Sequence, residues 1–298
     1  MKTPRDARGP PPPPPLLPLL LVLLVLLVAG ARIEGFRPVV IVHGIFDGPK
    51  QFKTLSLYIT KVHPGTEVSV IDLYDDLSTS LHHLESGKTF RFIPAWSVRS
   101  SCRGPSPSPG GLVCRALLAV TPDHNVHTFV SLSSPQAGQF GDTDYLRMFP
   151  DCIKKTVFRI CYNEMGQDLS ICDYWNDPHH RARYLRSNDF LPVLNGERVH
   201  VHMKAWRENF LRIKKLVLIG GPDDGVITPW QSSHFGFYDM NEDIVEMRNQ
   251  EFYRSDTFGL KTLDARGAVS VCVHSGVKHI QWHSNHTVFS SCIQKWLT

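Results

Sequence analysis

The sequence carries little net charge and has no long run of lysine and arginine after its N-terminus. Its 298 residues have a formal net charge of only +4, which is too small to favour a nucleic-acid partner. Charged residues make up 20% of the chain and hydrophobic residues 42%. These proportions exclude a disordered or coiled-coil chain and are typical of a globular protein. The length is sufficient for one large domain or two small ones with a substantial core.

Long apolar runs are equally scarce. The one extended stretch, residues 16–28, follows a basic N-terminus and precedes the small residues 29–31. It is shorter than the ~20 residues of a membrane-spanning helix and contains Pro18, which disfavours a membrane anchor. The layout predicts a secretory signal peptide over residues 1–31, cleaved after Ala31. No second candidate for a membrane span follows, and we expect none.

The cysteine count and one sequon also indicate the secretory route. Seven cysteines leave at least one thiol over if the others form disulfides. Cys161 and Cys172 are close in sequence, as are Cys272 and Cys292, so we expect local pairs, although spacing alone does not fix the connectivity. Asn285 begins the single acceptor motif for N-glycosylation and is predicted to lie at the surface.

The pattern of apolar residues indicates an α/β fold with a mostly parallel sheet. Residues 37–44 are an apolar, β-branched run that suits a strand buried on both faces. Residues 52–61 have helical spacing, and residues 68–73 form a second strand. A strand, a helix and a strand in this order predict a βαβ unit. Further buried strands are expected at residues 128–135 and 216–221, and helices at 112–120 and near 292–296.

Two segments lack this periodic order. Residues 76–109 contain no amphipathic helix and no apolar strand leading into Ser108. Residues 136–200 are rich in glycine, aspartate, asparagine and aromatic residues, and we interpret them as an insertion of loops and short helices, a lid over a site. The domain is predicted to span residues 36–298.

Ser108 and Gly110 stand before a helix in the second half of a Gly-x-Ser-x-Gly pattern. In an α/β-hydrolase this pattern forms a sharp turn that exposes a nucleophilic serine. By itself the match is weak, since Ser-Pro-Ser-Pro-Gly-Gly is also an ordinary loop composition. The His43-Gly44 pair after the first strand adds a second signal, because a backbone N–H at this point, that of Ile45, faces the oxyanion in such hydrolases.

A carboxylate and a histidine follow in the chain order of this class, which is Ser, Asp, His. Ser108, Asp224 and His279 are the candidate nucleophile, orienting acid and general base. Asp223 competes with Asp224 for the acid role, and His283 competes with His279 for the base. The two histidines, four residues apart, would also suit a metal, but no partner at metal-ligand spacing accompanies them, which disfavours that interpretation.

At these residues the chain resembles the lysosomal palmitoyl-protein thioesterases, and within that family its second member most closely. The resemblance runs from residue 38 to 75 and again from 110 to the end, roughly four-fifths of the mature chain, far more than a short motif. The matching stretches are residues 39–47, 63–66, 110–118, 131–136, 141–146, 220–233, 235–238 and 282–285.

The resemblance implies an α/β-hydrolase that cleaves fatty acyl thioesters in the lysosome, reached through the secretory route, with no metal or cofactor. Its substrate partner would be a palmitoyl-type thioester such as an acyl-CoA or an S-acylated cysteine. Matched position by position, the family's nucleophile falls on Ser108, its acid on Asp224 and its base on His279. Its local disulfides fall on Cys161 with Cys172 and on Cys272 with Cys292.

The chain departs from the family at residues 76–109. The family's elbow reads Cys-Tyr-Ser-Gln-Gly-Gly, whereas here Pro107 and Pro109 flank Ser108. Proline has no N–H to donate to an oxyanion and restricts the residue before it. An altered exon or reading frame and a true inactive variant would both give this pattern. The sequence therefore predicts weak hydrolysis, and the alternative function is a non-catalytic acyl-binding protein of the secretory route or lysosome.

Overall fold

The computed structural model describes residues 36–42, 49–71, 110–141, 156–169 and 171–297. All of them belong to a unit that comprises Phe36–Thr298. The predicted signal peptide over residues 1–31, the atypical segment over 76–109 and the candidate residues Ile45 and Ser108 lie outside the described residues.

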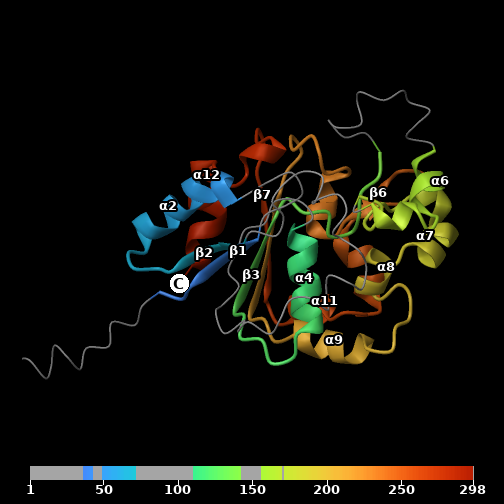
Figure 1. Ribbon diagram of the computed structural model, residues 1–298, viewed down its shortest axis with the longest axis horizontal. Helices are drawn as coiled ribbons and strands as arrows, with labels where there is room; N and C mark the ends of the chain where they lie inside the picture. Colours follow the sequence, from blue (N-terminus) through green and yellow to red (C-terminus); the bar gives the residue numbers. More distant parts are fainter. Residues whose placement is uncertain (1–35, 43–48, 72–109, 142–155, 170, 298) are drawn as a thin grey trace, which may run out of the picture. The chain divides into compact units, whose positions relative to one another are not determined.

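A βαβ unit begins the described chain (Figure 1). Strand β1 (Val39–Val42) pairs in parallel with β2 (Val68–Ile71), with Val39 opposite Val68. The 3-10 turn η1 (Pro49–Phe52) and helix α2 (Lys53–Val62) connect them. The parallel pair and the helix between its strands confirm the unit predicted from the apolar pattern.

A second parallel sheet holds three strands in the order β3, β4, β7. Their bounds are β3 (Thr128–Leu132), β4 (Lys215–Gly220) and β7 (Val269–Val273). Thr128 lies opposite Lys215, and Leu216 lies opposite Val269. Within the described part of the chain, β1 pairs only with β2 and β3 only with β4.

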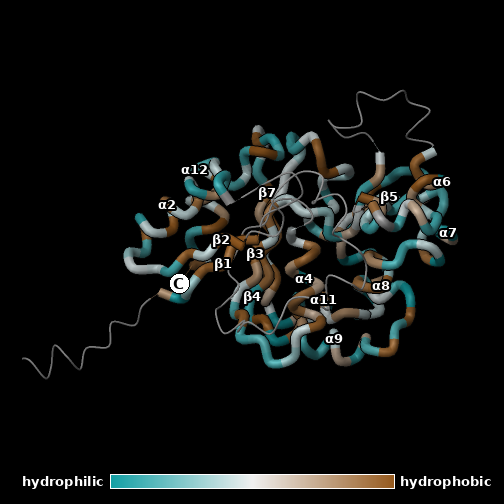
Figure 2. The backbone as a smooth tube through the Cα atoms, viewed as in Figure 1, coloured by the Kyte–Doolittle hydropathy of each residue, from teal (hydrophilic) through white to brown (hydrophobic). Residues whose placement is uncertain are grey.

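Side-chain alternation along these strands divides the core into two faces. Leu216 and Leu218 of β4 belong to a cluster with Phe210, Phe235 and Leu260 on one face. Val217 and Ile219 of the same strand point to the other face and belong to a second cluster. This cluster also contains residues of β1 and of the η1–α2 segment, namely Val39, Ile41, Phe52, Leu55 and Ile59. Figure 2 shows β1, β3 and β4 as mostly hydrophobic. Burial on both faces explains why these strands are continuous apolar runs.

Helix α4 (Gly110–Val120) lies between the sheet and a group of short helices. Its Cys114 and Leu118 belong to the same apolar cluster as the β4 residues of the first face. Its Leu112, Val113 and Ala116 face Tyr184 and Leu191 instead. Because both sides of α4 are covered, almost the whole helix is buried. The covering helices are α7 (Arg181–Ser187) and α8 (Leu191–Leu194).

The insertion predicted over residues 136–200 contains turns and short helices. Besides α7 and α8 it holds α6 (Val157–Cys161), η3 (Gly166–Asp168) and η4 (Pro178–His180). A disulfide joins Cys161 to Cys172 within it, the pair expected from the sequence.

The rest of the chain completes both faces of the sheet. A disulfide between Cys272 and Cys292 ties β7 to the C-terminal helical turns, again the pair expected from the sequence. Among the described residues, no helix is both long and apolar enough to cross a membrane. The remaining elements are α9 (Met203–Phe210), η5 (Trp230–His234), β5 (Phe237–Tyr238), β6 (Ile244–Val245), η6 (Met247–Asn249), α10 (Glu251–Arg254), α11 (Leu260–Ala265), η7 (His279–Gln281), α12 (His286–Val288), the π-helical turn η8 (Phe289–Ile293) and η9 (Gln294–Trp296).

Candidate active site

Three loops meet at the carboxyl ends of strands β3, β4 and β7. Ser133 directly follows β3, Asp224 lies in the loop after β4, and His279 begins η7 in the loop after β7. Because the three strands are parallel and adjacent, these loops lie at the same edge of the sheet. In open α/β sheets this is the edge at which ligands bind.

Asp224 and His279 are in direct contact at this edge. His279 Nδ1 lies 2.9 Å from Asp224 Oδ2 and 3.0 Å from Oδ1. The His279 backbone N–H also donates to the Asp224 carbonyl at 2.9 Å. An ionised carboxylate only accepts hydrogen bonds, so Nδ1 carries the proton and the Nε2 lone pair is left to act as a base.

Four further donors surround the same carboxylate. Ser133 Oγ and Trp282 Nε1 donate to Oδ2 at 2.5 and 2.6 Å. The backbone N–H groups of Val226 and Ile227 donate to Oδ1 at 3.0 and 2.8 Å. Burial by itself raises the pKa of Asp224, but the hydrogen bonds from His279, Ser133 and Ile227, together with the attraction of the His279 ring, outweigh it. The pKa of Asp224 therefore lies below its ordinary value, so this carboxylate stays ionised to a lower pH than an ordinary aspartate does.

The two competing residues are placed differently. Asp223 is exposed and its Oδ2 accepts from the Gly276 N–H at 2.7 Å. His283 is buried with its ring 4.9 Å from that of Phe52. Burial and the nearby His279 both lower the pKa of His283. The structure thus brings together Asp224 and His279, and it does not bring together Asp223 and His283.

The helix that follows the candidate nucleophile begins at this same edge. Ser108 and Ile45 themselves lie outside the described residues. Helix α4 starts at Gly110, and a Cβ atom on Gly111 would lie only 2.6 Å from Cβ of Ser134, the neighbour of Ser133. The N-terminus of α4 therefore lies beside the residues that bind Asp224, and its positive dipole end favours negative charge there.

Asn285, the predicted glycosylation site, lies in the same C-terminal stretch as His279. Asn285 is half-buried, and its Oδ1 accepts from the Val288 N–H at 3.1 Å as the N-cap of α12. The neighbouring Thr287 is exposed. No group of three or more His, Cys, Asp and Glu residues that would hold a metal ion occurs in the described ranges.

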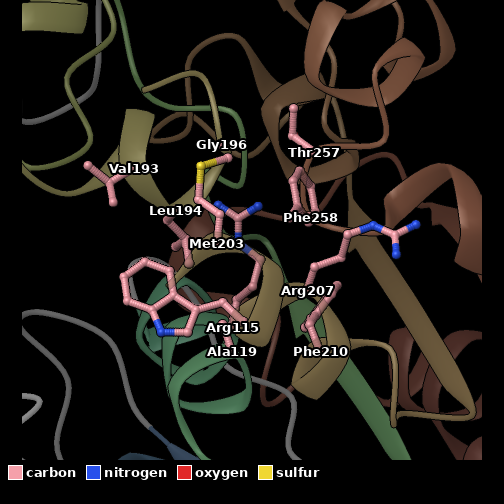
Figure 3. Close-up of a pocket in the computed structure, with 11 residues that line it drawn as sticks. Arg115, Ala119, Val193, Leu194, Gly196, Met203, Arg207, Phe210, Thr257 and Phe258 are labelled. Atoms are coloured by element: carbon pink, nitrogen blue, oxygen red, sulfur yellow. The ribbon is translucent and has the colours of Figure 1, made fainter. Parts of the chain in front are cut away.

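A small pocket of about 20 Å³ lies along α4 and α9, lined by neither Asp224 nor His279 (Figure 3). The guanidinium of Arg115 reaches into it and is buried between the rings of Phe235 and Phe258, 5.1 and 5.0 Å from their centroids. Arg115 Nη2 donates to Asn195 Oδ1 at 2.7 Å. Burial lowers the pKa of Arg115 to about 9. We assign this pocket no role in the candidate site.

The sequence did not predict that Ser133 and Trp282 contact Asp224. Both residues belong to stretches that resemble the family, yet no spacing or composition distinguished them from their neighbours. Their relation to Asp224 depends on the register of β3 against β4 and on the turn at η7, which only the tertiary structure gives.

Comparison with known proteins identifies the family. The model of the palmitoyl protein thioesterase family matches residues 38–279. The human protein named lysosomal thioesterase PPT2 is 52% identical over 271 residues, 88% of each chain. The rat protein of the same name is 52% identical over 267 residues with the same coverage. The Drosophila melanogaster lysosomal thioesterase PPT2 homolog is 37% identical over 270 residues, 88% of this chain and 92% of its own. The chain therefore belongs to the palmitoyl protein thioesterase family, and its fold is that of an α/β-hydrolase.

Proposed function

We propose that this protein is a serine thioesterase that hydrolyses fatty acyl thioesters of the palmitoyl type in the lysosome. One observation carries the proposal, namely the buried contact between His279 Nδ1 and the Asp224 carboxylate. Membership of the family and the names of the relatives, which are lysosomal thioesterases, support the same activity and compartment. The low pKa of Asp224 fits an acidic compartment, because the acid stays ionised there.

In this mechanism Ser108 is the nucleophile, His279 the base and Asp224 the orienting acid. The Ser108 hydroxyl attacks the thioester carbonyl and its proton passes to His279 Nε2. Asp224 stabilises the imidazolium that forms. The C–S bond then breaks, the proton on Nε2 passes to the thiolate, and an acyl-serine remains. Water, deprotonated by the same Nε2, attacks this ester, and the fatty acid leaves as Ser108 regains its proton.

The oxyanion of each tetrahedral intermediate needs donors. Ile45 N–H is the donor that the sequence assigns, and the dipole of α4 adds to it. The residue after the nucleophile normally supplies a second N–H, and here it is Pro109, which has none. We therefore expect turnover below that of a relative with a complete pair of donors.

The test is hydrolysis of palmitoyl-CoA by the purified mature protein and by single variants. We expect Ser108→Ala, Asp224→Asn and His279→Gln each to lower kcat by about 10³-fold or more, because each removes one member of a coupled unit. Asp223→Asn is the matched control for the acid, since Asp223 binds Gly276 and not His279.

The control variant should keep kcat within a few-fold of the unmodified protein. Equal losses in Asp223→Asn and Asp224→Asn would contradict the assignment of the acid. Turnover that survives Ser108→Ala would refute the nucleophile, and a protein that binds palmitoyl-CoA without hydrolysing it would refute the proposed activity.

A further inference from the structure

Two side chains, Ser133 and Trp282, make the shortest contacts to the candidate acid. Both donate to the same oxygen, Oδ2 of Asp224, at 2.5 and 2.6 Å. Ser133 is fully buried and Trp282 is 1% exposed. Hydrogen bonds to a charged group in a buried site are stronger than those between neutral groups.

The backbone holds the Ser133 hydroxyl in place at some cost. Ser133 has a φ of 42°, in the left-handed region that residues other than glycine rarely adopt. Its N–H donates to the Ile219 carbonyl at 2.7 Å and so extends the pairing of β3 with β4 by one bond. Strained backbone of this kind persists where the surroundings fix it, and it is concentrated at functional sites.

The Trp282 indole is held equally firmly. Its ring belongs to the buried cluster that contains Val277, Val288 and Phe289. A Cβ atom on Gly221 would lie 3.3 Å from Cη2 of the ring, so the loop after β4 packs closely on it. The same short segment carries His279 in η7, which links the base to a donor for its acid.

We propose that Ser133 and Trp282 are positioning residues that fix the Asp224 carboxylate, ionised and in one orientation, for its contact with His279. This inference rests on the proposed function, in which Asp224 orients the base. The four donors on Asp224 come from three loops, and each oxygen has its own pair. Rotation of the carboxylate about its Cβ–Cγ bond would break all four bonds, so the two oxygens keep their places opposite His279 Nδ1.

The charged and titratable groups that act on this carboxylate in the described residues are few. His279 touches it, and His283 lies beyond His279 and acts on that ring. Asp223, the adjacent acid, is directed at Gly276. His279 stabilises the anion most, and the neutral donors add to this through their hydrogen bonds to its two oxygens. Their loss would make Asp224 easier to protonate.

The chain offers a matched control for each donor. Trp282→Phe and Ser133→Ala remove the N–H and O–H groups and keep most of the packing. Trp175→Phe and Ser134→Ala make the same chemical changes at buried residues whose Nε1 and Oγ atoms have no hydrogen-bond partner among the described residues. Comparing the pairs separates loss of the bond to Asp224 from loss of a buried polar group.

The first readout is the carboxyl ¹³C resonance of Asp224 during a pH titration, assigned by its disappearance in Asp224→Asn. It reports on the folded protein whether or not the protein turns over. We expect the titration midpoint to rise by about 1–2 pH units in Trp282→Phe and in Ser133→Ala, and further in the double variant. Trp175→Phe and Ser134→Ala should leave it unchanged.

The second readout is the pH dependence of kcat with palmitoyl-CoA. The pH at which kcat falls on the acid side should be higher in Trp282→Phe and in Ser133→Ala, with KM little changed. Midpoints that stay equal to that of the unmodified protein, or that shift equally in the control variants, would overturn the inference. A shifted midpoint in a protein without turnover would instead refute the proposed function and leave the positioning roles intact.

Discussion

At the scale of single residues, His234 is a buried histidine that lowers the stability of the folded protein at acidic pH. It ends η5, is 8% exposed, and its Nε2 has no hydrogen-bond partner in the described part of the chain. Burial lowers the pKa of His234 to about 4, against 6.5 for a free histidine, and a backbone contact at Cys272 offsets only part of this. The unfolded chain thus binds a proton at a pH at which the folded protein does not.

This difference predicts a loss of stability between pH 6.5 and about 4. Because the unfolded state is protonated first, the free energy of unfolding falls as pH falls through this window, by on the order of 3 kcal/mol. His234→Gln should remove this contribution. Urea unfolding at a series of pH values measures the free energy of unfolding of both proteins. If this free energy falls equally with pH in the unmodified protein and in His234→Gln, His234 does not cause the loss of stability.

Asn285 is the residue at which we expect carbohydrate. Its Oδ1 caps α12, whereas a glycan is attached through Nδ2, so capping and glycosylation are compatible. Protein from a secretory host should lose apparent mass on treatment with a glycosidase, and Thr287→Ala should have the lower mass already. Thr287→Ala keeps the capping side chain, so a change in mass there reports on the sequon alone. Identical mobility of both proteins before and after treatment would contradict the expectation.

At the scale of elements, the contact between α4 and the loop after β3 is tight. A Cβ atom on Gly111 would lie 2.6 Å from both Cβ and Oγ of Ser134. Alanine normally stabilises a helix by about 1 kcal/mol relative to glycine. We expect Gly111→Ala to destabilise the protein nonetheless, by about 1–3 kcal/mol, because the clash forces α4 away from the loop.

A double-mutant cycle tests this expectation. Ser134→Gly removes the two nearest of the atoms that the added methyl group of Gly111→Ala would meet, so the double variant should be more stable than the sum of the single changes predicts. The free energy of unfolding in urea is the measurement. Additive effects within about 0.5 kcal/mol would mean that the two elements are not in the contact described.

The strands and helices also show which parts of the fold could be predicted from the sequence. β1, β3 and β4 are buried on both faces, and such strands give continuous apolar runs that are easily recognised. β7 was missed because it is only partly buried and alternates valine with polar or sulfur-containing residues. Short helices such as α10 and α11 also escaped, since four or six residues are too few to display a helical period.

For the candidate site, chain order and resemblance were enough to single out Asp224 and His279. They did not exclude Asp223 and His283, because adjacent residues and residues four apart fit the same pattern. The direction of each side chain is set by the turn after β4 and by the 3-10 geometry of η7. Neither turn has a signature in the sequence that fixes which of two acids faces inward.

At the scale of the whole molecule, the sequence predicts a departure from the family over residues 76–109. A chimera in which these residues are replaced by a family segment that ends in Cys-Tyr-Ser-Gln, the first part of the family's elbow, would have an elbow without proline. We expect its kcat for palmitoyl-CoA to exceed that of the unmodified protein by about 10²–10³-fold, the usual value of one oxyanion donor. The chimera with its nucleophilic serine changed to alanine gives the background rate. Equal turnover by the chimera and the unmodified protein would show that Pro107 and Pro109 are no obstacle.

The disulfide between Cys272 and Cys292 makes residues 272–292 a closed covalent ring. His279, Trp282 and Asn285 all lie inside it. If a protease cuts the backbone within the ring, for instance beside Ile280, which is 67% exposed, both new ends stay joined through sulfur. The base and its neighbouring indole would therefore remain attached to the molecule after cleavage, and the two fragments would separate only after reduction.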